Sequence, residues 1–192
     1  MGYNWMPNFN MNIDSNSESA QKARGLVDGN GEIILSFYKT AKKDIIVYSA
    51  AGNDSYSDSG PISVKYASPF NWAAKAAEER GLSVNAAIVE AHDQSGQTAT
   101  FSNVGGHLSC PGVDIVSVLA FDSGGSPSRN TYGTMSGTSM ASPYCAGSHA
   151  LLSVLRPNKS NQEILDCLLI GGETMETGAT KVDLALALKA CT

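Results

Sequence analysis

A serine at position 139 has the surroundings of a nucleophile. Gly137 lies just before it, and the small and apolar run 145–155 predicts a buried helix after it, with Pro143 in the opening turn. A hydroxyl at the start of a helix lies beside unpaired N–H groups and the positive end of the helix dipole. Those groups can stabilise the anion that forms when the hydroxyl attacks a carbonyl. Serine also commonly caps helices, so spacing alone leaves Ser139 with two possible roles.

The side-chain amide of Asn53 is a second candidate group. Residues 45–50 form a short apolar run rich in β-branched side chains, which predicts a buried parallel strand that ends just before Asn53. Ligand sites in parallel sheets lie at the carboxyl ends of strands. An amide N–H₂ donates hydrogen bonds without a charge to desolvate, so Asn53 could stabilise an oxyanion. Asparagine is also a common turn residue, and both roles fit the spacing.

Two segments resemble motifs of the subtilisin-like serine peptidases (subtilases). Residues 137–143 are similar to the nucleophile motif Gly-Thr-Ser-Met-Ala-Ser/Thr-Pro. This resemblance implies that Ser139 is the nucleophile. Residues 47–54 resemble the family segment that ends in Ala-Ala-Gly-Asn, which implies that Asn53 is the oxyanion donor. The same resemblance implies that the primary specificity pocket is lined by Ala50, Ala51 and Gly52.

Two further matches follow in the family's order. Residues 99–105 look like the motif A-x-F-S-N-x-G, and residues 110–115 look like A-P-G-V-x-I with cysteine in place of alanine. The resemblance extends from Phe9 to the C-terminus. It implies an α/β, three-layer subtilisin-like fold with a parallel sheet, in which 1–192 form the C-terminal portion of one catalytic domain.

The proton-transferring partners of the serine are missing from this pattern. The subtilase triad runs Asp, His, Ser along the chain, but no motif like His-Gly-Thr-His precedes Asn53. The three histidines all follow it: His92, His107 and His149. The last of these lies ten residues beyond Ser139, roughly 15 Å along the same helix. We therefore expect it to be a helix side chain with a polar partner, and the chain alone to be inactive.

Three interpretations remain. The first is a serine endopeptidase that cleaves polypeptide substrates and whose aspartate and histidine come from the missing N-terminal half of the domain. The second is a non-catalytic pseudopeptidase that binds proteins, favoured by the absent histidine and by Asn12-Ile13-Asp14 in place of the family's Ser-Leu-Gly. The third, an unrelated α/β hydrolase, lacks a Gly-x-Ser-x-Gly motif. The intact Ser139 and Asn53 favour the first, and the family resemblance implies an extracellular location.

Composition excludes several other classes. The net charge is −5 and the sequence pI is about 5.1, with no basic run, which argues against a nucleic-acid partner. No apolar stretch reaches the roughly 18–20 residues of a membrane span. The four cysteines form no CxxC pair, so we expect no zinc site. Calcium is common in the family, but Asp54, Asp58 and Asp122 are only loop carboxylates, and we assign no metal ligand or cofactor.

The remaining sequence predicts the elements around the site. We expect Cys145 to be a free buried thiol, whereas Cys167 and Cys191 lie on two C-terminal helices and could pair. A capping box at Ser160-x-x-Glu163 predicts a helix to about residue 170, and Thr180-x-x-Asp183 a last helix. The other expected elements are a strand at 9–13, a loop at 15–31, helices at 32–43 and 71–80, strands at 82–89, 97–103 and 113–119, and a loop at 122–130.

Overall fold

The computed structural model describes residues 15–40, 45–55, 60–121 and 127–192. Several predictions fall outside these ranges: the strand at 9–13, the segment Asn12-Ile13-Asp14, and the carboxylates Asp58 and Asp122. Within the described ranges, no helix combines the length and apolar character needed to cross a membrane.

A mainly parallel sheet carries the site. Its five strands run in the order β1-β2-β3-β7-β6. The strands β1, β2, β3 and β7 are parallel to one another, and the edge strand β6 pairs antiparallel with β7. This confirms the predicted fold class and places the carboxyl ends of β1 and β3 at the same edge. The strands are β1 (Val47–Ala50), β2 (Ala86–His92), β3 (Leu108–Pro111), β6 (Gly172–Thr174) and β7 (Thr180–Val182).

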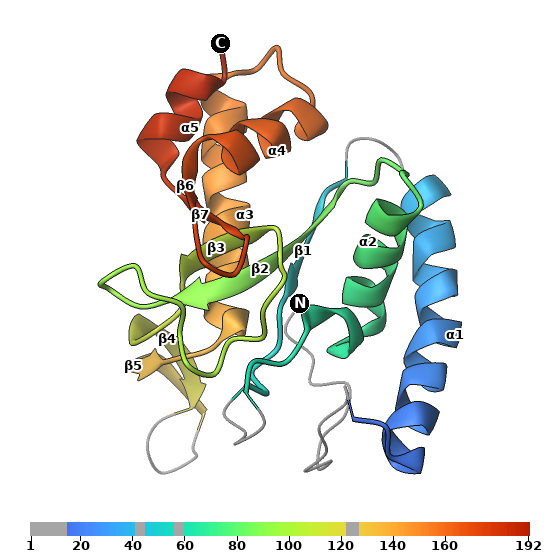
Figure 1. The fold of residues 1–192 in the computed structure, drawn as a ribbon. Coiled ribbons are helices and arrows are strands. Elements are labelled where there is room, and N and C mark those ends of the chain that lie inside the picture. Colours follow the sequence, from blue (N-terminus) through green and yellow to red (C-terminus); the bar gives the residue numbers. More distant parts are fainter. Residues whose placement is uncertain (1–14, 41–44, 56–59, 122–126) are drawn as a thin grey trace.

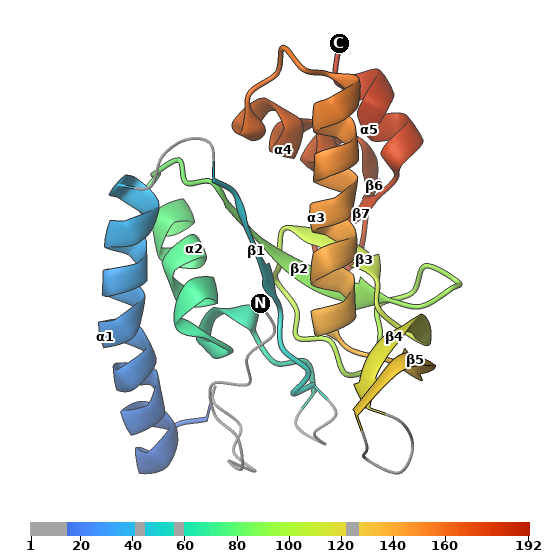
Figure 2. The ribbon, with the colours of Figure 1, turned by 180° about the vertical axis from the view of Figure 1, so that it is seen from behind.

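Helices cover both faces of this sheet, which gives the expected three layers (Figure 1, Figure 2). On one side, α3 packs on β1, β2 and β3, and on the other side α2 packs on β1 and β2 with α1 beside it. Side chains along β2 alternate between the two faces of the sheet: Val89 and Ala91 lie in the core under α3, and Ile88 lies in the core under α2. The helices are α1 (Glu18–Thr40), α2 (Pro69–Glu79), α3 (Thr138–Leu155), α4 (Asn161–Ile170) and α5 (Leu184–Ala190).

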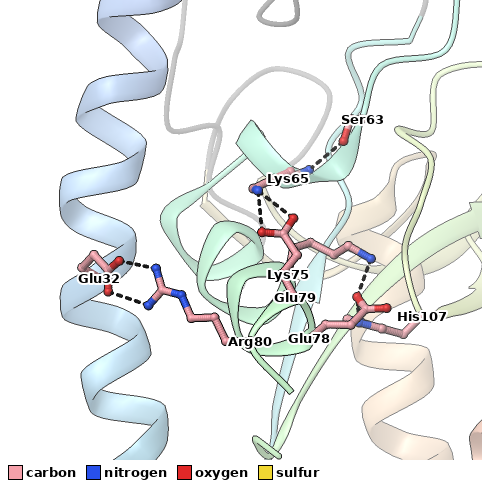
Figure 3. A network of polar contacts seen from close by, with 8 residues as sticks. All are labelled: Glu32, Ser63, Lys65, Lys75, Glu78, Glu79, Arg80 and His107. Carbon is pink, nitrogen blue, oxygen red and sulfur yellow. Dashed lines mark hydrogen bonds and ion pairs between the residues drawn. The ribbon is translucent and has the colours of Figure 1, made fainter. Parts of the chain in front are cut away.

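The α1 helix corrects the expectation of a loop at 15–31. Its buried side chains recur at helical spacing, and Val27 and Leu35 lie in the α2 core. Gly31 lies where the helices touch, because a Cβ there would come within 2.3 Å of the Trp72 ring. The glycine that suggested a loop is therefore a packing site. Arg80 pairs with Glu32 across the same contact (Figure 3).

The helix that carries Ser139, α3, is buried on one side only, contrary to the prediction of burial all round. Cys145 and Leu152 are fully buried in one core cluster. Tyr144, Leu151 and Val154 are 53%, 47% and 76% exposed. Among the described residues nothing covers this apolar stripe, although its composition is that of a core helix.

Four strands escaped prediction and one predicted strand is absent; the unexpected strands are β3, β6, β7 and the strand at 127–135. The strands β4 (Ile115–Phe121) and β5 (Pro127–Met135) pair antiparallel, so part of the expected loop at 122–130 is strand. The expected strand at 97–103 is a turn region with one isolated bridge, between Thr98 and His92. The short strand β3 lies in the Gly-rich stretch that appeared to be a connection.

The C-terminal elements follow their predicted caps with one shift. The Ser160–Glu163 capping box begins α4 as expected. At the next predicted start, Thr180 belongs to β7, and Asp183 caps α5 instead. The cysteines form two disulfides, Cys110–Cys145 and Cys167–Cys191. The second pairing was open; the first overturns the expected free thiol, because β3 passes directly under α3.

Candidate active site

Ser139 lies in the first turn of α3 but does not cap it. Gly137 occupies the N-cap position and no side-chain cap bond is made. Ser139 is therefore the second helical residue, half-exposed, with its hydroxyl not used to close the helix. The capping interpretation is wrong for this residue. The helix also begins early enough that Pro143 is its sixth residue, inside the helix rather than in the opening turn.

Asn53 lies directly against the residue before the serine. Its Oδ1 accepts hydrogen bonds from the backbone N–H and the hydroxyl of Thr138, both at 2.9 Å. The Thr138 hydroxyl accepts in turn from the N–H of Gly52 at 3.1 Å. Because Oδ1 faces two donors, the orientation of the amide is determined, and Nδ2 faces away from Thr138. Asn53 is exposed, so this donor is open to solvent.

Because Gly137 has no side chain, a small space is left between Asn53 Nδ2 and the Ser139 backbone nitrogen. A Cβ built there would lie 3.1 Å from Asn53 Nδ2, 3.8 Å from the Ser139 backbone nitrogen and 3.6 Å from Met140 Sδ. Among the described residues we find no hydrogen-bond acceptor for the Ser139 N–H. Two N–H donors therefore border one small space next to the Ser139 turn, as stabilisation of an oxyanion requires.

Residues 50–52 form one side of this site. Ala50 and Gly52 are half-buried, whereas the Ala51 side chain is fully buried in the α2 core, so only its backbone could face a substrate. Gly52 has φ +102° and lies so close to Asn103 that a Cβ would come within 2.5 Å of its Nδ2. The buried Asn71 donates to the carbonyl oxygen of Ala50 at 3.0 Å. The strand end is thus rigidly held.

The start of α3 is held to the sheet from below. The Gly137 N–H donates to the Gly112 carbonyl at 2.7 Å, just after β3. Gly112 has no room for a side chain, since a Cβ would lie 2.6 Å from Ala91. Two residues before Gly112, Cys110 carries the disulfide to Cys145 on α3. The turn that carries Ser139 is therefore attached to the end of β3 both by a hydrogen bond and by a covalent link.

None of the three histidines serves this serine as a base. Tyr48 donates to His149 Nδ1 at 2.8 Å, and the other ring nitrogen faces Asn161, so the predicted polar partner is confirmed. His107 Nδ1 accepts from the Ile88 N–H at 2.8 Å and pairs with Glu78 on α2 (Figure 3). His92 contacts Ser109 at 2.9 Å. Burial lowers the pKa of all three rings.

Carboxylates near the site do not form a metal centre in the described part of the chain, where no cluster of three potential ligands occurs. Asp54, next to Asn53, accepts a hydrogen bond from Asn103 Nδ2 at 3.1 Å. The site thus offers a hydroxyl and two N–H donors, which suit acyl transfer, but no base.

Three polar residues that shape the site were not predicted: Thr138, Asn71 and Asn103. Two of them lie inside recognised motifs, in Gly-Thr-Ser and in F-S-N, so the motif match contained their signal. Asn71 lies in a helix with no motif, and only its complete burial shows its role.

Comparisons with known proteins show which family this chain matches. The model of the Subtilase family matches residues 1–179. Subtilisin NAT from Bacillus subtilis subsp. natto is 32% identical over 169 residues, which cover 86% of this chain and 39% of that protein. The thermostable alkaline protease of Halalkalibacterium halodurans is 30% identical over 165 residues, covering 85% and 37%. The chain thus spans less than half the length of these relatives.

Solved structures share the fold. The prenylagaramide maturation protease PagA superposes with a TM-score of 0.53 at 20% identity, over 95% of this chain and 58% of that one. A protease from Pseudoalteromonas arctica PAMC 21717 gives a TM-score of 0.56 at 20% identity, over 93% and 48%.

Proposed function

We propose, because this chain belongs to the subtilase family, that it forms the nucleophile-bearing part of a serine endopeptidase. Ser139 attacks the scissile carbonyl of a polypeptide, and the Asn53 amide and the Ser139 N–H hold the oxyanion. The observation that supports this assignment best is the pair of Thr138 hydrogen bonds to Asn53 Oδ1, which turn Nδ2 toward the space beside Gly137.

The histidine and aspartate that move the proton come, in this proposal, from a polypeptide outside these 192 residues. All three histidines of the chain are engaged elsewhere. Two uncovered surfaces fit such a polypeptide. Among the described residues β1 pairs only with β2, which leaves a parallel strand with a free edge. The exposed apolar stripe of α3, Tyr144 to Val154, lies on the face away from the sheet.

We also propose that the protein acts outside the cell or in another oxidising compartment. The two disulfides support this location, since such bonds persist where thiols are not kept reduced. The substrate is an extended polypeptide whose first side chain before the cleaved bond lies against residues 50–52.

A fluorophosphonate probe tests the assignment. On the chain alone we expect no labelling, because a serine without a base stays protonated and weak. Extended by the segment encoded upstream of Met1, the protein should become labelled at Ser139, and Ser139→Ala should abolish the label. Stoichiometric labelling of the chain alone would contradict the missing base. If the upstream sequence contains no Asp-Ser/Thr-Gly and His-Gly-Thr-His motifs, the alternative of a non-catalytic binding module is favoured.

A further inference from the structure

Asn103 forms hydrogen bonds to the residues on both sides of Asn53, the candidate oxyanion donor. Its backbone N–H donates to the Gly52 carbonyl at 3.0 Å, on the residue before Asn53. Its side-chain Oδ1 accepts from the Asp54 N–H at 2.9 Å, on the residue after. We propose that Asn103 is a positioning residue, which fixes the turn 52–54 so that the Asn53 amide points at the oxyanion. The inference rests on the proposed role of Asn53.

The chemistry of the contact determines which residue type can make it. Nδ2 of Asn103 donates to the Asp54 carboxylate at 3.1 Å, while Oδ1 faces the Asp54 N–H and, at 3.3 Å, the Ser55 hydroxyl. A flipped amide would set donor against donor and oxygen against carboxylate. Asn103 is completely buried, so water cannot replace a lost partner. One side chain thus satisfies both the backbone and the side chain of Asp54.

Asn103 is itself held by the sheet and by a neighbouring loop. Ser102 accepts from the Ala91 N–H in β2 at 3.1 Å and donates to the Asn103 carbonyl at 3.0 Å. The Val104 N–H donates to the Ile62 carbonyl at 2.9 Å. Through Asn103 and Ser102, the turn 52–54 is therefore linked to strand β2. On the opposite side, Thr138 holds Asn53 to α3, so the donor lies between two fixed elements.

The first test needs no catalysis and uses this chain. The Thr138 amide donates to Asn53 Oδ1 and does not touch Asn103, so its hydrogen-exchange rate reports how firmly Asn53 is held. Asn103→Asp sets a carboxylate against that of Asp54, and we expect Thr138 to exchange about tenfold faster or more. Adding Asp54→Asn re-forms the bond in reverse and should restore slow exchange. Unchanged exchange in Asn103→Asp would overturn the inference.

A matched control separates positioning from general loss of stability. Thr177 donates to the buried carboxylate of Glu90 at 2.7 Å, in a different part of the sheet. Thr177→Val removes a buried hydrogen bond of similar worth, and we expect it to lower the unfolding midpoint while Thr138 exchange stays as in the unaltered protein. If Thr177→Val speeds the hydrogen exchange of the Thr138 amide as much as Asn103→Asp does, the effect is a global loss of stability and the positioning role is wrong.

The second test is a double-mutant cycle in the protease completed by the polypeptide that supplies the histidine and aspartate. We expect Asn103→Asp to lower kcat by about 10- to 100-fold with KM nearly unchanged, and to have no further effect in the Asn53→Ala background. An equal loss in both backgrounds would contradict positioning. If Asn53→Ala itself leaves kcat unchanged, the proposed function fails, and the exchange of Thr138 still decides whether Asn103 holds Asn53.

Discussion

Removing the Cys110–Cys145 disulfide should destabilise the protein and loosen the Ser139 turn in particular. The bond joins β3 to α3 across 35 residues of sequence, and the enclosed segment contains the β4–β5 hairpin and Ser139. Both cysteines are fully buried, which separates the bridge from reductants in solution. The double substitution Cys110→Ala/Cys145→Ala is suitable, because alanine is the residue that the subtilase motif has at the first position.

The magnitude follows from the loop that the bridge closes. In the chain-entropy account, a separation of 35 corresponds to about 3.8 kcal/mol at 25 °C. The Cys167–Cys191 bridge, with a separation of 24, corresponds to about 3.4 kcal/mol. Domains are typically stable by about 5–15 kcal/mol. Either loss would thus remove a large part of the stability, and the two bridges should differ little in their global effect.

Urea denaturation and hydrogen exchange together test this reasoning. Cys167→Ala/Cys191→Ala, which unlinks α4 from α5, is the matched control. Both double variants should show a lower midpoint, but only Cys110→Ala/Cys145→Ala should speed exchange in the hairpin and at Thr138 beyond its global effect. A loss below about 1 kcal/mol would show that the loop-closure account fails here. Equal exchange at Thr138 in both variants would show that the bridge does not hold the turn.

Three other perturbations have expected outcomes. The free energy of unfolding should fall as the pH drops below about 6.5, because the histidines bind protons more readily in the unfolded chain than in the folded protein, where burial lowers their pKa. In urea titrations at several pH values, His107→Asn should reduce the dependence of this free energy on pH by up to about 1.4 kcal/mol per pH unit. Gly31→Ala should lower the free energy of unfolding by about 1–3 kcal/mol, because its Cβ would collide with the Trp72 ring. Gly29→Ala, whose Cβ would have no atom within 4 Å, should raise it by about 0.5–1 kcal/mol in the same urea assay. Gly137→Ala should lower kcat of the completed protease more than it raises KM, because the methyl lies 3.1 Å from Asn53 Nδ2; a pure KM effect would contradict the placement of the oxyanion there.

The sequence predicted the parts of the fold that rest on local signals. The capping box at Ser160, the apolar run ending at Ala50 and the helix at 71–80 all carry such signals, and each corresponds to a helix or strand. The first half of α1, up to Gly31, was missed because glycine normally disfavours helices. The reason for Gly31, its contact with Trp72, depends on a residue 41 positions away. Tertiary packing overrode local propensity.

The candidate site shows the same division. Motif matches indicated Ser139 and Asn53, and the structure brings their elements together through Thr138. The residues that fix this geometry could not be derived from spacing. Asn103 and Asn71 act through long-range bonds, and the partner of Cys145 depends on β3 passing under α3. Such contacts follow from the order of strands in the sheet, which periodicity does not determine.

In the proposed function, this chain supplies the groups that bind the anion, and another polypeptide supplies the groups that transfer the proton. The groups that hold Asn53 and the Ser139 turn belong to the turn 52–54, Asn103, the residue after β3 and the start of α3, and hydrogen bonds and a disulfide join them. We propose that the polypeptide that supplies the base covers the free edge of β1 and the exposed stripe of α3. Binding of a tetrahedral anion and transfer of a proton are therefore separable here: a substitution at Asn53 should weaken the first without changing which polypeptide supplies the second.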